Sequence, residues 1–137
     1  MSELSGGCLC GQLRFVLSGA PQMTAICHCR DCQKQSGSAL SVAVLAASTA
    51  VTVSGTAKIF EKAGDSGHTV QRHFCPACGS TVLSTPTAIA GIVVLKGGAF
   101  DDTSWIKPTH HIFCDSAQTW YQIPPDTANF PRMPAFG

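Results

Sequence analysis

Apolar and polar residues follow the two-residue period of a β-strand or form short apolar runs in this chain, and no long stretch follows the helical period. The clearest case is the segment 11–19, G-Q-L-R-F-V-L-S-G, in which Leu13, Phe15 and Leu17 share one side. That pattern predicts a strand with one buried face. Shorter apolar runs predict further strands at residues 39–46, 50–53, 81–84, 91–96 and 110–114.

A hairpin and one short helix complete the predicted elements. Residues 58–62 and 68–74 flank A-G-D-S-G, a turn sequence, and the second of them leads directly into C-P-A-C-G. Residues 30–36 contain good helix formers, and Gly37 stands where the C-cap of a helix belongs. Helix is therefore a minor component of the predicted fold.

The composition is that of a single globular domain. The 137 residues are 45% hydrophobic and 12% charged, which is enough to bury one modest core. The segment 124–137 holds four prolines and is expected to be extended or loosely docked. We therefore predict a mainly β domain over residues 1–123, followed by a proline-rich tail over residues 124–137.

Charge and hydropathy argue against nucleic acid and membranes as partners. Nine basic and eight acidic residues leave a net charge of +1, and basic residues are not interleaved with aromatic ones. The uncharged segment 36–57 has an apolar part that is shorter than the about 20 residues of a spanning helix. We expect two buried strands there, joined by a Ser-Thr turn. No signal peptide is apparent, so a cytoplasmic location is expected.

Eight cysteines carry the candidate chemistry, at positions 8, 10, 27, 29, 32, 75, 78 and 114. In a reducing compartment such cysteines more often bind metal than form disulfides. A secreted disulfide scaffold is the alternative.

Four of these cysteines form two pairs that suit one zinc ion. Cys75 and Cys78 lie in C-P-A-C-G-S, where the two-residue gap lets a tight turn direct both sulfurs at one metal. Cys8 and Cys10 are expected to point to the same face of an extended strand, with Leu9 facing away. Together the pairs complete a tetrahedral set of thiolates, which is typical of a structural site.

Three cysteines remain in the stretch C-H-C-R-D-C, namely Cys27, Cys29 and Cys32. Cys32 is expected on the first turn of the predicted helix, so all three can face one metal. Three protein ligands with an exchangeable fourth position are the pattern of catalytic zinc. Three thiolates leave the site with a net negative charge, which favours thiol chemistry over the activation of water.

Other interpretations of this cluster stay open at the level of sequence. A distant fourth ligand would make it a second structural site, and a redox relay among the thiols is a further alternative. The candidates for a fourth ligand are Cys114, His73, His110 and His111. His28 is a poor candidate because its side chain should point away from those of Cys27 and Cys29.

The segments C-L-C-G, C-H-C-R-D-C-Q-K-Q-S-G, F-C-P-A-C-G-S and H-H-I-F-C-D-S-A-Q-T-W-Y occur in that order between Gly6 and Tyr121. This set resembles the glutathione-dependent formaldehyde-activating enzyme family, whose domain is shared with the centromere protein V family. The resemblance implies a fold of several coiled antiparallel β-sheets. It also implies condensation of glutathione with formaldehyde to S-hydroxymethylglutathione, a carbon–sulfur lyase reaction.

The resemblance also implies two zinc ions per chain. Structural zinc is then held by Cys8, Cys10, Cys75 and Cys78, and catalytic zinc by Cys27, Cys29 and Cys32. A glutathione-like thiol and an aldehyde are the implied partners. The second site is expected to be prone to metal loss and oxidation. A non-catalytic zinc module that binds a partner protein, and a thiol or zinc sensor, are the alternative functions.

Several residues near these motifs carry weaker expectations. Arg30 and Lys34 are close to the three-cysteine cluster in sequence and suit an anionic thiol, although solvated helix charges are the simpler interpretation. Asp31 is expected to cap the helix. His73 is expected to make a structural hydrogen bond in the hairpin, and Cys114 to be a buried free thiol on a strand.

Overall fold

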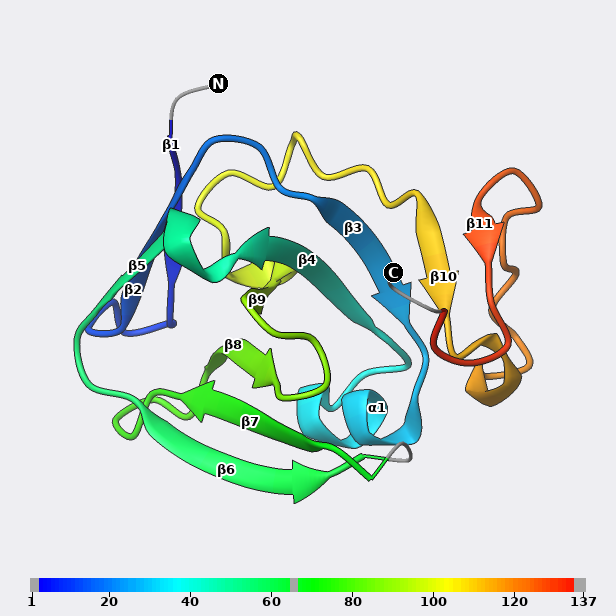
Figure 1. Cartoon of the computed structure of the whole chain (residues 1–137), viewed down its shortest axis with the longest axis horizontal. Coiled ribbons are helices and arrows are strands. Elements are labelled where there is room, and N and C mark those ends of the chain that lie inside the picture. The colour runs from blue at the N-terminus through cyan, green and yellow to red at the C-terminus, as the bar shows by residue number, and fades with distance from the viewer. Residues whose placement is uncertain (1–2, 65–66, 135–137) are drawn as a thin grey trace.

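The computed structural model of the protein describes residues 3–64 and 67–134 (Figure 1). Within these ranges it contains eleven strands, one α-helix and three short 3₁₀ turns. The strands are β1 (Glu3–Gly7), β2 (Arg14–Ser18), β3 (Met23–Cys27), β4 (Ser41–Ala47), β5 (Val51–Ser54), β6 (Lys58–Ala63), β7 (Thr69–Phe74), β8 (Thr81–Pro86), β9 (Ile92–Lys96), β10 (His110–Ile112) and β11 (Ala128–Asn129). The helix is α1 (Arg30–Ser36), and the 3₁₀ turns are η1 (Ser48–Ala50), η2 (Gly97–Ala99) and η3 (Cys114–Ser116).

The strands form two sheets. The smaller has the order β1-β2-β5, and the larger has the order β11-β10-β3-β4-β9-β8-β7-β6 and curls around the helix (Figure 1). Pairing is antiparallel throughout the smaller sheet and from β3 to β6 in the larger one. The exceptions are β10 with β3 and β10 with β11, which are parallel. The predicted mainly β fold is therefore confirmed, with a mixed edge on the larger sheet.

The hydrophobic core lies where β2 packs against β4, β8 and β9. Leu13, Phe15 and Leu17 expose 1% of their surface or less, as their alternation predicts. They meet Val44, Val82 and Leu95 in one buried cluster. The ring of Phe15 packs edge-on against that of Phe100, with centroids 4.9 Å apart. Full burial of each such side chain stabilises the fold by about 1.5–3 kcal/mol. The buried side chains of Leu13, Phe15 and Leu17 therefore help to hold the two sheets together.

The uncharged segment folds as strand, turn and strand, as expected, through β4, η1 and β5. β4 is buried, but β5 is an exposed edge strand in which Val53 has 46% of its surface accessible, so its predicted burial is wrong. β5 pairs only with β2 in the three-stranded sheet, which leaves its outer face in water. None of the helices in residues 3–64 and 67–134 is both long and apolar enough to cross a bilayer.

The predicted hairpin is formed by β6 and β7, in register from Lys58 opposite Phe74 to Ala63 opposite Thr69. Its turn is closed by a hydrogen bond from the Gly64 N–H to the His68 carbonyl, 2.8 Å. The central turn residues of the predicted A-G-D-S-G, 65 and 66, lie outside the described residues.

The late strand is shorter than predicted, and the tail is ordered against it. β10 ends at Ile112 because Phe113 adopts a left-handed conformation, φ 56°, which a strand does not accommodate. In the tail, Ala128 and Phe130 donate backbone hydrogen bonds of 2.9 Å to the carbonyls of Thr109 and His111. The described part of the proline-rich segment thus extends the large sheet by one short strand, β11.

Candidate metal centres and cleft

Two turns from different sheets bring four sulfurs together. Cys8 and Cys10 lie in the turn between β1 and β2, and Cys75 and Cys78 lie in the turn between β7 and β8. Their four Sγ atoms all lie within 4.8 Å of one another. The Cys8–Cys10 and Cys10–Cys75 sulfur distances are 3.6 and 3.7 Å. The structure therefore assembles the four-cysteine set that the spacing suggested.

The first pair reaches this geometry through a turn, and the expectation of an extended strand is wrong. β1 ends at Gly7, and the N–H of Gly11 donates to the carbonyl of Cys8 at 3.1 Å. The N–H of Cys8 donates to the carbonyl of Leu13 at 2.9 Å, which closes the hairpin. Leu9 still faces away from the cluster, with 89% of its surface exposed.

The second pair sits on a tight turn of the kind that suits a metal. The N–H of Gly79 donates to the carbonyl of Cys75 at 2.8 Å, and the N–H of Cys75 donates to the carbonyl of Ser80 at 2.9 Å. Gly79 has φ 79°, a left-handed conformation that glycine adopts without steric cost. The turn therefore folds the chain back so that Cys78 joins Cys75 on one side.

Hydrogen-bond donors favour the thiolate form of two of the four cysteines, Cys75 and Cys78. The Gln12 amide donates to the Cys75 sulfur at 3.0 Å and lowers the pKa of that thiol. Hydrogen bonds from the Ser80 hydroxyl and backbone lower the pKa of Cys78 to about 5. The N–H of Leu13 donates to the Cys8 sulfur at 3.3 Å. Donors directed at sulfur are what a set of metal-bound thiolates requires.

The four-sulfur cluster fits zinc by size as well as by chemistry. Zn–S bonds of about 2.3 Å in a tetrahedron place the sulfurs about 3.8 Å apart. The observed separations of 3.6 and 3.7 Å are close to this value. With four protein ligands such a set is closed, and it joins the three-stranded sheet to the eight-stranded one.

The second cluster forms where β3 passes into α1. Cys27 is the last residue of β3, Cys29 is the N-cap of α1, and Cys32 lies in its first turn. The three Sγ atoms lie within 4.8 Å of one another. The helix ends at Gly37, which has φ 68° and bonds back to the carbonyl of Gln33, as the sequence predicts.

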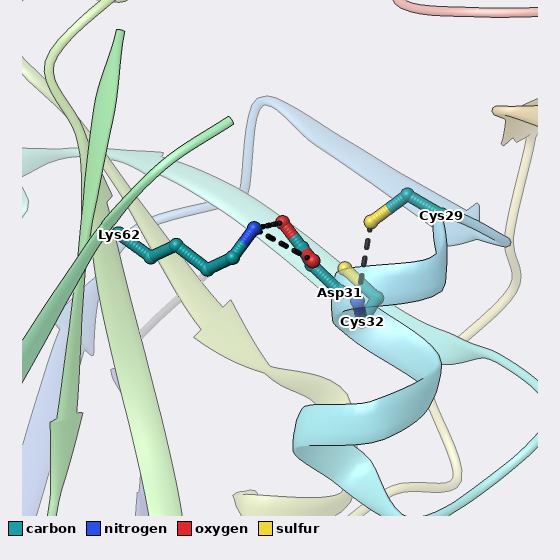
Figure 2. Close-up of polar contacts among 4 residues, drawn as sticks. All are labelled: Cys29, Asp31, Cys32 and Lys62. Carbon is teal, nitrogen blue, oxygen red and sulfur yellow. Dashed lines mark hydrogen bonds and ion pairs between the residues drawn. The ribbon is translucent and has the colours of Figure 1, made fainter. Parts of the chain in front are cut away.

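The cap of α1 is a thiol, and the expectation that Asp31 caps the helix is wrong. The Cys29 sulfur accepts the N–H of Cys32 at 3.2 Å (Figure 2). This places Cys29 at the cap position, one turn before Cys32. Asp31 points away from the helix start and forms an ion pair with Lys62 of β6, 3.0 Å (Figure 2). The pair links α1 to the far edge of the curled sheet.

No fourth histidine, cysteine or carboxylate in the described parts of the chain comes within 4.8 Å of all three sulfurs. His28 is fully buried and stacks against His111, with ring centroids 5.7 Å apart. Each candidate fourth ligand is engaged elsewhere: His111 with Thr127 and Tyr121, His110 with Thr109, His73 with Thr85, and the Cys114 thiol with the carbonyl of His111. His73 thus makes the structural hydrogen bond expected of it, although to β8 rather than within the hairpin.

The thiols of this three-cysteine cluster differ in pKa. Contacts with Cys29 and Cys32 raise the pKa of Cys27, which is buried. Contacts with Cys27 and Cys29 lower the pKa of Cys32, and the nearby positive charge of Lys96 lowers it further. The cluster thus places a stabilised thiolate at Cys32. Soft thiolates in this number fit zinc.

Gln33 fixes the bend that carries the cluster, and sequence reasoning missed it. Its side chain exposes 4% of its surface and donates to the carbonyls of His28, 2.7 Å, and Ser116, 2.9 Å. Its carbonyl oxygen accepts from Arg30 and Gln118. A buried glutamine on a short helix gives no sequence signal of its own, because its partners come from elsewhere in the chain.

The three-sulfur cluster opens into a cleft of about 500 Å³. Strand register arranges one wall in rows: Cys27 beside Ser41, then Ala25 beside Ala43 and Lys96, then Met23 beside Leu45 and Val94. The last row continues through Ser84 to Arg72. The cleft therefore runs from sulfur at one end, over an apolar surface, to β7.

Among the described residues, the cationic side chains of Arg30, Arg72 and Lys96 line this cleft, and the one acidic lining residue, Asp31, is paired with Lys62. Arg30 therefore borders the site as its position in sequence suggested, whereas Lys34 does not line the cleft and instead lines a neighbouring surface hollow, to which Arg30 also contributes. Sequence reasoning missed Lys96 and Arg72. Both lie at inward positions of strands, but only the register shows which cavity they face.

Comparison with known proteins agrees with the geometry of the cysteine clusters. The model of the family described as glutathione-dependent formaldehyde-activating enzyme matches residues 3–116. A search of curated proteins finds no match. The crystal structure of a Rhodobacter sphaeroides protein, a structural genomics target, superposes with a TM-score of 0.58 at 15% identity, covering 76% of this chain and 91% of that chain. At this identity the likeness shows a common fold.

Proposed function

The chain belongs to the glutathione-dependent formaldehyde-activating enzyme family, and on this premise we propose that it joins glutathione to formaldehyde as a cytoplasmic carbon–sulfur lyase. The product would be S-hydroxymethylglutathione. The observation that carries the proposal is the three-sulfur cluster of Cys27, Cys29 and Cys32, open to a cleft and without a fourth protein ligand among the described residues.

Two zinc ions per chain belong to this proposal. Cys8, Cys10, Cys75 and Cys78 would hold the structural one, and Cys27, Cys29 and Cys32 the catalytic one. Zinc bound at the second cluster would keep an incoming thiol deprotonated at neutral pH.

The reaction requires a sulfur nucleophile and a way to move one proton. The thiolate sulfur forms a bond to the aldehyde carbon, the C=O π bond breaks, and its electron pair takes up a proton at oxygen. The proton that the thiol released balances the one that the oxygen gains. Lys96 in the cleft supplies positive charge beside the sulfurs, which stabilises both the thiolate and the developing alkoxide.

The fold supplies the rigidity that such a site needs. Cys27 is held at the end of a central strand, and Cys29 and Cys32 are held by one helix turn and by the Gln33 hydrogen bonds. The Asp31–Lys62 ion pair joins the helix to β6 beside the cleft. Preorganised ligands and a partly enclosed cavity favour a reaction between two small molecules over the docking of a protein.

The test combines metal content with turnover. Protein prepared under reducing conditions should contain two zinc ions and should accelerate adduct formation, measured by NMR exchange between formaldehyde and glutathione. Cys32→Ser should lose one zinc and the acceleration. Cys114→Ser is the matched control, because that thiol belongs to neither cluster, and it should keep both.

Two results would redirect the assignment. Two zinc ions with no acceleration and no response of the second site to glutathione would support a zinc module that binds a partner protein. Reversible release of one zinc on mild oxidation, again without acceleration, would support a thiol or zinc sensor.

A further inference from the structure

Arg72 is a buried cation for which residues 3–64 and 67–134 supply no hydrogen-bond or ion-pair partner. It exposes 8% of its surface and lines the cleft from β7. The ion pairs of the described chain join Arg14 to Asp101 and Lys62 to Asp31, and no hydrogen bond satisfies the Arg72 guanidinium there. The nitrogen atoms of the Arg72 guanidinium are not fully enclosed by protein, so they are accessible from the cleft.

A buried guanidinium without a counter-charge is costly, because removal of its hydration is not offset by a partner. The neighbours in its row, Ser84 and Val94, carry no charge. Asp31, the acidic group of the cleft, already pairs with Lys62. The part of the chain that the structure describes thus places no free anion at this arginine. A carboxylate fits the flat, forked donor set of a guanidinium with two parallel hydrogen bonds.

The surface between Arg72 and the sulfurs is apolar. The wall consists of Ala25 and Ala43 next to the cysteine row, and then of Met23, Leu45 and Val94. Pro86 and Ile89 add further apolar lining. This lining suits the hydrocarbon part of a substrate. The four residue steps from Met23 to Cys27 also span about 13 Å, far more than formaldehyde occupies.

From these observations we propose that the cleft binds a small molecule with a carboxylate at one end, an apolar body, and its reacting thiol or aldehyde at the other end. Arg72 binds the carboxylate, the wall of Ala43 and Leu45 receives the body, and the reacting end lies at Cys27, Cys29 and Cys32. The inference deepens the proposed function, on which it rests, by naming the class of substrate that this cleft selects.

Calorimetric titration of the zinc-loaded protein tests the carboxylate directly. Mercaptohexanoate and mercaptohexanol share a thiol and an apolar body and differ in the carboxylate alone. We expect the acid to bind about tenfold more tightly, the effect of one charge-assisted contact. Arg72→Gln should reduce the difference to less than about twofold, and Arg72→Lys should retain part of it. Arg14→Gln, which removes an exposed cation from β2, is the matched control and should change nothing.

A second experiment tests whether the aldehyde, and not the thiol, carries the carboxylate. With glutathione as thiol, turnover of oxohexanoate is compared with that of hexanal in the same variants. A preference for the acid that depends on Arg72, in either arm, supports the inference. Equal affinity and equal turnover for acid and neutral probes overturn it, as does a preference that Arg72→Gln leaves intact. Should Arg72→Gln fail to fold, the wild-type ratio and Arg72→Lys decide the question.

The outcome is separable from that of the proposed function. Binding of mercaptohexanoate through Arg72 without any acceleration of adduct formation would refute the enzymatic proposal and leave this one standing. Turnover of glutathione and formaldehyde with no preference for a carboxylate would do the reverse.

Discussion

Replacement of Gln33 by methionine should loosen the second cysteine cluster and destabilise the fold. The substitution keeps the size of the side chain and removes its amide, so packing changes little. It leaves the carbonyls of His28 and Ser116 without the donors that now lie 2.7 and 2.9 Å away. Because Gln33 exposes only 4% of its surface, water does not replace those donors freely.

The magnitude follows from these two carbonyls. Each buried acceptor left without a partner costs about 1–3 kcal/mol, so the pair costs about 2–4 kcal/mol when part of the loss is recovered by relaxation. An entropy of unfolding of about 2.1 cal/mol/K per residue gives a chain of this length about 0.3 kcal/mol per degree. The melting temperature of Gln33→Met should therefore fall by about 7–14 °C.

The assay follows both stability and metal. Thermal unfolding gives the melting temperature, and a chromophoric chelator gives the rate at which each zinc leaves. The His28 carbonyl lies between Cys27 and Cys29, so the zinc of that cluster should leave faster while the other keeps its rate. Gln71→Met is the control, because the Gln71 amide donates to the exposed Glu61 and accepts from the Thr85 hydroxyl, so its loss leaves no backbone carbonyl without a donor. A melting temperature within about 2 °C of the wild type, with unchanged zinc release, would refute this account of Gln33.

Four substitutions separate the roles of the clusters and charges. Cys75→Ser should abolish cooperative unfolding in circular dichroism because the closed cluster joins the two sheets, whereas Cys32→Ser should stay folded with one zinc by metal analysis. Asp31→Asn should shift the melting temperature by less than about 3 °C, since its pair with Lys62 is partly exposed and worth at most about 1 kcal/mol. Lys96→Met should raise the pKa of Cys32, because a cation that favours the thiolate is lost, and alkylation of the metal-free protein should then require a higher pH. Unchanged pH profiles would contradict the role given to Lys96.

The cysteine clusters were accessible from sequence because ligand spacing is a local property. Cys75 and Cys78 need only a tight turn, and Cys32 needs only the first turn of a helix that its own residues favour. The cap of that helix was missed because aspartate is a common N-cap residue and cysteine is not, yet Cys29 occupies the position.

Two strands, β3 and β1, were not predicted because their sequences lack the pattern that identifies a strand. β3, M-T-A-I-C, is buried at four of its five residues, so it shows no alternation between an inner and an outer face. β1, E-L-S-G-G, ends in two glycines, which lower the propensity for strand. The cleft was unpredictable for another reason: Arg72 and Lys96 face it only because β7, β8 and β9 pair in one particular register.

The parallel pairing of β10 with β3 has a consequence for biosynthesis. Ala25, Ile26 and Cys27 find their neighbours on that side only at residues 110–112, more than eighty positions further along. While the ribosome is still making the intervening chain, the strand that ends in Cys27, the first thiol of the three-sulfur cluster, has unpaired backbone amide groups along one edge. A nascent chain stalled before residue 110 would therefore expose an unpaired strand edge that favours aggregation. The edge is covered only when residues 110–112 have been synthesised and pair with β3.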